Sequence, residues 1–269
     1  MPAFTQSTAK IAAWNLAGFG QGGIPQERLE RQAQGLSYLD AEVVVLVEVN
    51  PPSAIETLEM ELAKCGLEYD HVLLEQNSSL HIGVLFKRGI TAQNAFLLEG
   101  SDLGDGAKRK ALVVDIEVGR FDFKLIAVHL KSGRQKSNQQ IRDEQCKVIG
   151  DFITAQRASS REDILLVGDF NMIPGQDISN FHHLGGDDLM DFLSSWDLQA
   201  RFSHILEAGR ANLLDGFAIS RTFSTEYVRG SLRLFPMHWT MDMGRERFRE
   251  RVSDHLPFVA TFKIDRSRD

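Results

Sequence analysis

The chain has 269 residues, of which 43% are hydrophobic and 25% charged, so it can bury a substantial core as a globular protein. No apolar run approaches the roughly 20 residues that cross a bilayer, which excludes a membrane span. The net charge of −7 argues against a generally basic surface for nucleic acids, although an enzyme that acts on phosphates needs only local positive charge.

The start of the chain lacks the charged and apolar regions of a secretory signal, and a strand begins within its first ten residues. We therefore expect a cytoplasmic protein, or a secreted or periplasmic one if a leader has been removed. Cys65 and Cys146 lie in helical patterns where a small apolar side chain would fit. We expect both to be reduced thiols in the core rather than a disulfide.

The first third of the chain predicts alternating strands and helices. A strand over residues 10–16 carries Asn15 near its end and leads into a glycine-rich loop. Pro25 then opens a helix with one buried face. A nearly continuous apolar run over residues 42–48 predicts a buried strand that ends on the carboxylate of Glu48.

The middle of the chain predicts a second helix, several strands and a long third helix. The second helix follows Pro51 and Pro52 and has an apolar stripe. Strands are predicted over residues 70–75, 81–87 and 91–99, and a β-hairpin over residues 109–118 and 121–129. The hairpin ends at His129. The long helix, residues 137–157, is predicted to bury one face made of Ile141, Val148, Ile149 and Phe152.

A buried strand from Ile164 to Val167 follows the long helix, and Gly168 breaks it where Asp169 and Asn171 appear. A carboxylate and a carboxamide two residues apart point the same way, so they can offer a proton acceptor and a hydrogen-bond donor to one small volume. The alternative is an ordinary turn, because Gly, Asp and Asn favour turns whatever the function.

The last third predicts fewer regular elements. They are a helical stretch over residues 187–196, a strand over residues 212–220 that contains Asp215, a short strand over residues 232–236, and a last strand that follows Asp254 and His255. No repeat, low-complexity tract or linker divides the sequence, so we expect one domain over residues 1–269. The order of strands and helices favours an α/β or mixed fold.

Most of the polar residues singled out above lie at the ends of apolar, strand-like segments. They are Asn15, Glu48, His129, Asp169, Asn171, Asp215, Asp254 and His255. Carboxylate and amide oxygens suit Mg²⁺ or Mn²⁺, whereas Zn²⁺ is disfavoured because neither cysteine is nearby. Two histidines with separate aspartates indicate imidazoles that transfer protons or stabilise charge on a phosphate.

With these residues and the motifs around them, the sequence resembles the endonuclease/exonuclease/phosphatase superfamily, the DNase I-like metal-dependent phosphoesterases. The resemblance covers essentially the full length through W-N-L at Asn15, V-E-V at Glu48, V-H-L at His129, V-G-D-F-N ending at Asn171, L-D-G-F at Asp215 and S-D-H-L-P ending at Pro257. The family often has Gln where this chain has Val47, and Tyr where it has Gly216. Both differences could alter the pocket without removing a ligand.

The resemblance implies a four-layer α/β/β/α sandwich of two packed mixed β-sheets flanked by helices, with the site at one edge. Glu48 would be the principal Mg²⁺ ligand, with Asn15 and Asp254 close to the metal. Asp169 would orient or deprotonate the attacking water, and Asn171 would bind the phosphate. His255 would stabilise the transition state or protonate the leaving oxygen, Asp215 would hold a histidine, and His129 would supply the second imidazole.

A histidine at the position of His129 resembles both DNase I-like nucleases and sphingomyelinase-like phosphodiesterases, and the segment H-L-K-S-G resembles the former. Arg109 and Lys131 are then expected to contact phosphate. The resemblance implies a Mg²⁺-dependent phosphodiesterase that cleaves by in-line attack of water, acts as a monomer and has DNA as one candidate substrate. A phospholipid, a phosphoinositide or a small phosphoester is the alternative, and an inactive binding module is a more remote one. Selectivity would lie in loops at residues 18–24, 99–108, 175–188 and 238–250.

Overall fold

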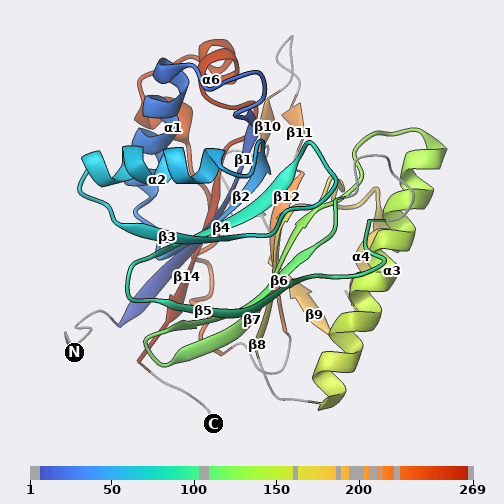
Figure 1. Cartoon of the computed structure of the whole chain (residues 1–269). Helices are drawn as coiled ribbons and strands as arrows, with labels where there is room; N and C mark the ends of the chain where they lie inside the picture. The colour runs from blue at the N-terminus through green and yellow to red at the C-terminus, as the bar shows by residue number, and fades with distance from the viewer. Residues whose placement is uncertain are drawn as a thin grey trace.

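The structure is a computed structural model, and it describes residues 7–102, 109–159, 163–185, 189–193, 203–205, 211–212, 214–220 and 225–265. Two six-stranded sheets pack against each other (Figure 1). The first has the order β13 (Arg233–Leu234), β14 (Phe258–Lys263), β1 (Thr8–Phe19), β2 (Val43–Val49), β4 (His81–Lys87), β3 (Tyr69–Leu73). The second has the order β5 (Thr91–Leu97), β6 (Leu112–Val118), β7 (Phe121–His129), β8 (Asp163–Asp169), β12 (Asp215–Ser220), β9 (Met190–Phe192).

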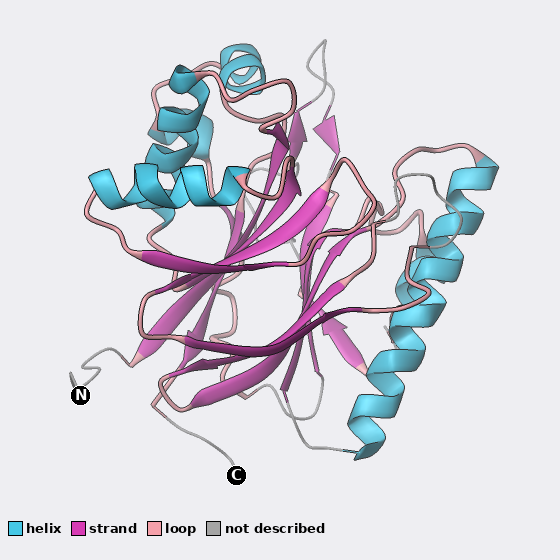
Figure 2. Cartoon of the chain, viewed as in Figure 1, coloured by secondary structure: helices cyan, strands magenta, loops and turns pink. Residues whose placement is uncertain are grey.

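Helices cover the outer faces of both sheets, which gives the four-layer α/β/β/α sandwich expected from the sequence (Figure 2). The first sheet carries α1 (Gln26–Leu39), α2 (Ala54–Lys64), α5 (Met237–Thr240) and α6 (Arg245–Arg251). The second carries α3 (Lys136–Ser159) and α4 (Ile178–His183), and a short pair, β10 (His204–Ile205) with β11 (Ala211–Asn212), lies outside the two sheets. None of the described helices is long and apolar enough to cross a membrane.

The strand β8 has apolar side chains on both of its faces. Leu165 and Val167 belong to the large apolar cluster that includes residues of both sheets. Leu166 faces the other way, into a second cluster with Ile149 and Ile153 of α3. Because successive side chains of a strand point to opposite faces, a strand covered on both sides must be apolar throughout.

Both sheets are mixed, and their parallel pairs bring the predicted polar residues to one edge. β1 pairs in parallel with β2, and β7 pairs in parallel with β8. The carboxyl ends of these four strands therefore lie at the same edge of the sandwich, which is the upper edge in Figure 1. His129 and Asp169, which end their strands, and Asn15 and Glu48, which lie in the C-terminal halves of theirs, are thus brought together by topology.

Three details of the sequence prediction are wrong. Cys65 is exposed, because it caps the C-terminus of α2 beyond the last buried turn. Residues 190–192, predicted as part of a helix, form the edge strand β9 that pairs with β12, and the rest of that predicted stretch lies mostly outside the described residues. Tertiary pairing thus overrides local helical preference in this short segment.

The third difference concerns the buried face of α3. Arg142 and Gln145 are buried there, whereas the predicted Ile141 and Val148 are only half-buried. The two polar side chains bind backbone instead of solvent. Arg142 Nη1 donates to the Lys131 carbonyl at 2.7 Å, and Gln145 Oε1 accepts from the Lys131 amide at 2.9 Å. A count of apolar residues cannot find a helix face that is used to hold a loop.

Candidate active site

Three predicted site residues lie side by side at the end of the second sheet. Asp169 on β8 is directly opposite His129 on β7 and also opposite Asp215 on β12. All three are buried, and His129 Nε2 is 3.8 Å from Asp169 Oδ2. The strand order therefore places an imidazole and two carboxylates in one row.

Asn15 connects this row to the first sheet. Its side-chain nitrogen Nδ2 donates to Glu48 Oε1 at 3.2 Å and to Asp169 Oδ2 at 3.1 Å. Its oxygen accepts from the Ala17 amide at 2.9 Å, which fixes the orientation of the carboxamide. Asn15 thus holds two carboxylates from different sheets around one small volume.

Two site residues have left-handed backbone conformations, which are costly for residues other than glycine. Glu48 has a φ of +66° and lies where the register of β2 against β4 shifts, and Asn171 has a φ of +49°. The shift leaves the Glu48 side chain 24% exposed, whereas Val47 and Val49 on either side are fully buried. Such strain persists only where the surrounding structure imposes it, and it is concentrated at functional sites.

Asn171 is held close to Asp169. Its backbone amide donates to Asp169 Oδ1 at 2.9 Å, and its Nδ2 donates to the Leu130 carbonyl at 3.1 Å. Gly168 precedes them with a φ of +139°, and a Cβ there would lie 2.2 Å from the Val128 carbonyl oxygen. The glycine of V-G-D-F-N is therefore required for the close approach of β8 to β7.

His129 is paired with the guanidinium of Arg109. The distance from Arg109 Nη1 to His129 Nε2 is 2.9 Å, and both residues are buried. Burial, together with the charge of Arg109, lowers the pKa of His129 well below its usual value. The imidazole is therefore neutral at pH 7, and the positive charge at this position is on Arg109.

His255 has the opposite character. Its Nδ1 lies 2.7 Å from Asp215 Oδ2, and both groups are buried. Burial alone would lower the pKa of His255, but the Asp215 carboxylate, aided by Asp169 and Asp254, raises it to about 10. The two predicted imidazoles thus differ in charge, because one faces a guanidinium and the other a carboxylate.

Asp169 lies between these two imidazoles. Burial and the neighbouring Asp215 carboxylate raise its pKa well above the usual carboxyl range, while His255 and the Asn171 amide act in the opposite sense. A carboxylate with a raised pKa is a stronger proton acceptor than an exposed one.

His204 and Arg28 also lie at the site, although no sequence motif marked either. His204 Nε2 is 3.2 Å from Asp254 Oδ2, and its ring lies 4.7 Å from that of His255. Arg28 interacts electrostatically with both Asp254 and Glu48. Neither residue lies in a recognisable motif, so no signal in a single sequence could have identified them.

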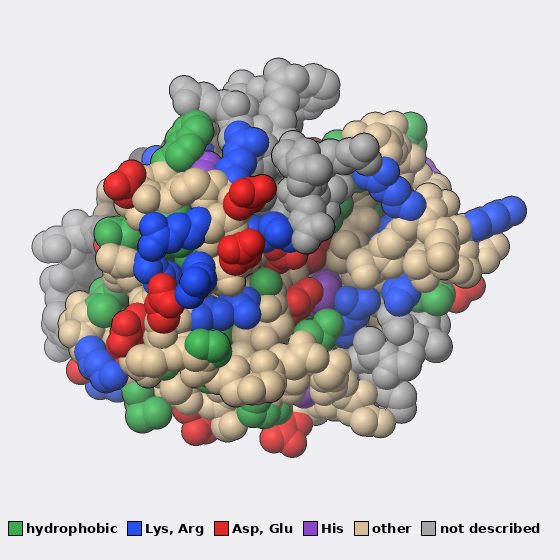
Figure 3. Space-filling view, turned by 90° about the horizontal axis from the view of Figure 1, so that it is seen from above, with side chains coloured by type: hydrophobic (Ala, Val, Ile, Leu, Met, Phe, Trp, Pro, Cys, Tyr) green, Lys and Arg blue, Asp and Glu red, His purple; other side chains and the backbone are tan. Residues whose placement is uncertain are grey.

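The positive charge around the site lies on its rim. Figure 3, which looks onto the upper edge of Figure 1, shows acidic side chains and histidine in the middle with Lys and Arg on two sides. Lys131 lies two residues beyond the end of β7, and Gln145 of α3 binds its backbone amide. The chain is acidic overall, but the surface beside the carboxylates is basic.

The donor set fits a hard divalent cation. Glu48 is partly exposed and close to the buried Asp169 through Asn15, so a carboxylate is available at the solvent side of the cluster. Such oxygen ligands suit Mg²⁺ or Mn²⁺, which keep several waters when bound. His204, Asp254 and His255, and separately Asp169, Asp215 and His255, also place ligand atoms within 4.8 Å of one another.

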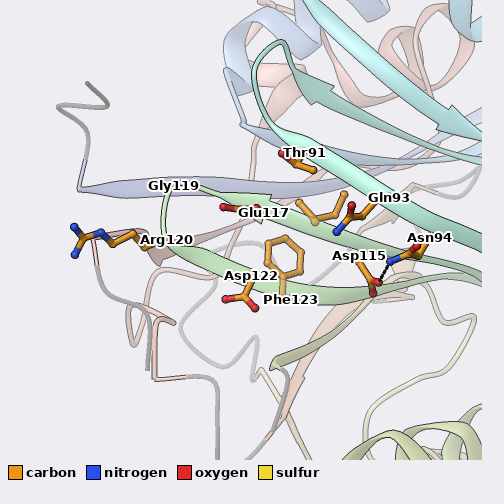
Figure 4. Close-up of a pocket in the computed structure, with 10 residues that line it drawn as sticks. Thr91, Gln93, Asn94, Asp115, Glu117, Gly119, Arg120, Asp122 and Phe123 are labelled. Atoms are coloured by element: carbon orange, nitrogen blue, oxygen red, sulfur yellow. Dashed lines mark hydrogen bonds between the residues drawn. The ribbon is translucent and has the colours of Figure 1, made fainter. Parts of the chain in front are cut away.

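A separate hollow of about 550 Å³ lies at the opposite end of the second sheet (Figure 4). It is lined by β5, the β6–β7 turn and nearby residues, among them Asp115, Glu117, Arg120 and Asp122. It contains none of the predicted site residues. The strand-end cluster, and not this hollow, is therefore the candidate active site.

No family model matches the sequence, and no curated protein sequence matches it. Solved structures do match over almost the whole chain. Zebrafish (D. rerio) TDP2 bound to a single-strand DNA product has a TM-score of 0.71 at 16% identity and covers 96% of this chain and 100% of that one. The human Nocturnin catalytic domain has a TM-score of 0.69 at 16% identity, covering 96% and 95%.

A protein from Bacteroides thetaiotaomicron described as an endonuclease/exonuclease/phosphatase family member has a TM-score of 0.71 at 14% identity, covering 98% of this chain and 100% of its own. At such low identity these matches establish the fold. They agree with the two packed mixed sheets described above, and they do not by themselves assign an activity.

Proposed function

Because the chain has the endonuclease/exonuclease/phosphatase fold, we propose that it is a metal-dependent phosphodiesterase and, more specifically, a DNase I-like endonuclease. One observation carries the proposal. The buried Asp169 lies between a neutral imidazole paired with Arg109 and a protonated imidazole paired with Asp215. This arrangement provides a proton acceptor and two sources of positive charge around one small volume.

Glu48, with Asn15 and Asp254 nearby, would hold Mg²⁺ or Mn²⁺. When bound, the cation would offset charge that develops on the phosphate and fix its position. Asn15 acts in this proposal by orienting Glu48 and Asp169, since its NH₂ group already binds both carboxylates. Asp254 is oriented in turn by His204.

Asp169 accepts a proton from the attacking water, which its raised pKa favours. Asn171, fixed to Asp169 through its backbone amide, binds a phosphate oxygen. His255 donates a hydrogen bond or its proton to the phosphate and leaving oxygen, and Asp215 keeps it charged for that role. The buried Arg109, with His129 beside it, contacts the phosphate inside the site, and Lys131 contacts it from the rim.

The nucleic-acid assignment has separate support. TDP2 of zebrafish, which has the same fold, is seen with a single-strand DNA product. The present chain has Lys and Arg on two sides of its acidic centre, where they can contact a phosphate backbone (Figure 3). A phospholipid, phosphoinositide or small phosphoester remains the alternative substrate class.

A substrate panel tests the proposal. Supercoiled DNA, RNA, sphingomyelin, inositol phosphates and bis(p-nitrophenyl) phosphate are each incubated with Mg²⁺ and with chelator. The variant Glu48→Gln should lose most activity, about 10²-fold or more, and bind metal more weakly while its fold is unchanged. Glu56→Gln, an exposed carboxylate on α2, is the matched control and should retain activity.

Undiminished activity in chelator, or full turnover by Glu48→Gln, would contradict the proposed mechanism. Hydrolysis of only a lipid or small phosphoester would keep the reaction type and overturn the nuclease assignment. If no phosphoester is hydrolysed, the remaining hypothesis is a catalytically inactive binding module.

A further inference from the structure

The C-terminal end of α6 borders the candidate active site. The Val252 carbonyl at the end of α6 accepts from Arg28 Nε at 3.3 Å and from Gln32 Nε2 at 2.8 Å. Asp254 follows two residues later, and α6 lies against β10, which carries His204 (Figure 1). A ligand that extends from the site in this direction would therefore meet α5 and α6.

α6 is the most basic helix that the structure describes. Its seven residues, R-E-R-F-R-E-R, include four arginines and two glutamates. Arg245 and Arg247 are exposed, and Arg251 shares the single carboxylate of Glu27 with Arg31, at 3.0 Å from each. One carboxylate between two guanidiniums leaves this surface positive, in contrast to the net charge of −7 for the whole chain.

Trp239 on α5 is 62% exposed, which is unusual for the largest apolar side chain. Its neighbours hold the backbone firmly, because Met237 is fully buried and the Met243 amide donates to the His238 carbonyl at 2.7 Å. The buried His238 ring lies 5.0 Å from the Trp239 ring. The same imidazole packs against Phe248 of α6, with ring centroids 6.2 Å apart. The indole on α5 and the helix α6 are thus held close together through one buried imidazole.

A flat exposed aromatic ring beside guanidinium groups is the arrangement that binds single-stranded nucleic acid, because bases stack on the ring and phosphates pair with the cations. A membrane surface fits less well. The apolar residue of α6, Phe248, is fully buried in the core, so the helix has no free apolar face to insert into lipid.

We propose that Trp239 and the arginines of α6 form a docking surface for single-stranded nucleic acid, which holds the strand on one side of the cleaved phosphodiester. The inference rests on the proposed function for its substrate class. It adds that an unpaired base stacks on Trp239 while Arg245 and Arg247 contact the neighbouring phosphates. Duplex DNA, whose bases are already stacked, should bind this surface more weakly.

Binding is measured by fluorescence anisotropy with labelled oligo-dT, oligo-U and duplex DNA, in the Asp169→Asn background so that the strand is not cut. Trp239→Ala should weaken binding of the single strands by about 10-fold, and Trp239→Phe should retain most of the affinity. The exposed apolar controls Met60→Ala and Ile178→Ala lie on other helices and should change affinity less than about twofold.

The contribution of the arginines to binding is measured separately, through the salt dependence of the affinity. Arg247→Ala should reduce the slope of log affinity against log salt for a single strand by about 0.7, whereas Arg88→Ala, an exposed arginine on the turn after β4, should leave the slope unchanged. In the active chain, Trp239→Ala should lose more efficiency on an oligonucleotide than on bis(p-nitrophenyl) phosphate. The difference should appear mainly as a higher KM for the oligonucleotide.

Two failures are distinguishable. If the chain hydrolyses the small diester but Trp239→Ala and Trp239→Phe bind oligonucleotides as tightly as the parent, the docking surface is wrong and the proposed function stands. If no phosphodiester is hydrolysed while oligonucleotide binding depends on Trp239, the proposed function is wrong and the surface stands. Binding to anionic vesicles is measured with the same variants. If Trp239→Ala loses vesicle binding while its oligonucleotide binding is unchanged, the surface binds lipid and not nucleic acid.

Discussion

The charge of each imidazole at the site is set by the residue that faces it. His129 faces Arg109 and is neutral, whereas His255 faces Asp215 and is charged. The two histidines occur in similar triplets, V-H-L at the end of one strand and D-H-L before another, so the sequence alone could not separate their protonation states. The difference in charge arises from the partners themselves, Arg109 before β6 and Asp215 on β12, which only the folded chain brings to the two rings.

The pH dependence of activity follows from these pairs. Activity should rise with pH as Asp169 loses its proton, above the usual carboxyl range, and fall again as His255 loses its proton near pH 10. Asp215→Asn removes the charge that raises the pKa of His255, so the alkaline limb should move to lower pH by one unit or more. Each pH unit corresponds to about 1.4 kcal/mol of lost stabilisation of the protonated imidazole.

The measurement is kcat/KM for a small phosphodiester across pH, with the exposed Asp151→Asn on α3 as the control. An alkaline limb at the same pH in Asp215→Asn and in the parent would show that His255 does not act through its charge.

His238 offers a test of stability rather than activity. It is 1% exposed, neither ring nitrogen has a hydrogen-bond partner among the described residues, and burial together with Arg245 lowers its pKa from 6.5 to about 4. Between these two values the unfolded chain binds a proton that the folded chain does not. The free energy of unfolding should therefore fall as pH decreases from about 6.5 to about 4, by at most about 1.4 kcal/mol per pH unit.

Urea unfolding at several pH values measures this contribution. His238→Leu should remove the corresponding part of the pH dependence, and the exposed His182→Leu should keep it. Parallel curves for the parent and His238→Leu would mean that the pKa of His238 is the same in the folded and unfolded chain.

At the scale of the elements, the ends of strands were predictable because an apolar run followed by a polar residue is visible in the sequence. The run over β8 and the residues Asp169 and Asn171 illustrate this. The buried face of α3 was not predictable, because Arg142 and Gln145 are buried to bind the Lys131 backbone. His204 and Arg28 were missed for a related reason, since only the folded chain brings them to Asp254.

The motif glycine of β8 can be tested at the same scale. In Gly168→Ala the new Cβ would meet the Val128 carbonyl at 2.2 Å in a left-handed backbone, so β7 and β8 would have to separate. We expect a loss of stability above about 3 kcal/mol and a displaced Asp169. Gly230→Ala, which also has a positive φ but open space around it, should cost only about 1 kcal/mol in thermal or urea unfolding. Equal losses in the two variants would show that close strand approach is not the constraint.

For the molecule as a whole, the acidic balance limits how a polyanion is held. The sequence has 37 acidic and 30 basic residues, and Lys and Arg gather beside the acidic centre on the face shown in Figure 3. Most of the surface therefore repels DNA, and attraction is confined to the rim of the site and α6. The composition alone predicted weak general binding, but the position of the basic rim required the fold.

This distribution predicts a shallow salt dependence. If only the rim residues such as Lys131 and the arginines of α6 contact phosphates, about three or four phosphates are neutralised, and log affinity for a single strand should fall against log salt with a slope of about −2 to −3. Lys131→Ala should reduce that slope by about 0.7. The affinities are measured with Asp169→Asn in chelator. A slope of about −6 or steeper would mean that the strand binds a much larger surface than the rim of the site and α6.

Cleavage, like binding, should depend on contacts with phosphates rather than on the base sequence. The contacts proposed above are all to phosphates or to the flat face of a base and none reads a base edge, so nicking of supercoiled plasmid in Mg²⁺ should be largely independent of sequence. Nick positions mapped by primer extension should be spread along both strands, and Asp169→Asn should leave the plasmid intact. Because phosphate contacts dominate, raising the salt concentration should slow nicking more than it slows hydrolysis of bis(p-nitrophenyl) phosphate, which carries a single negative charge. Nicks confined to one short motif, or equal salt effects on the two substrates, would show that binding does not depend on the backbone contacts proposed for the rim.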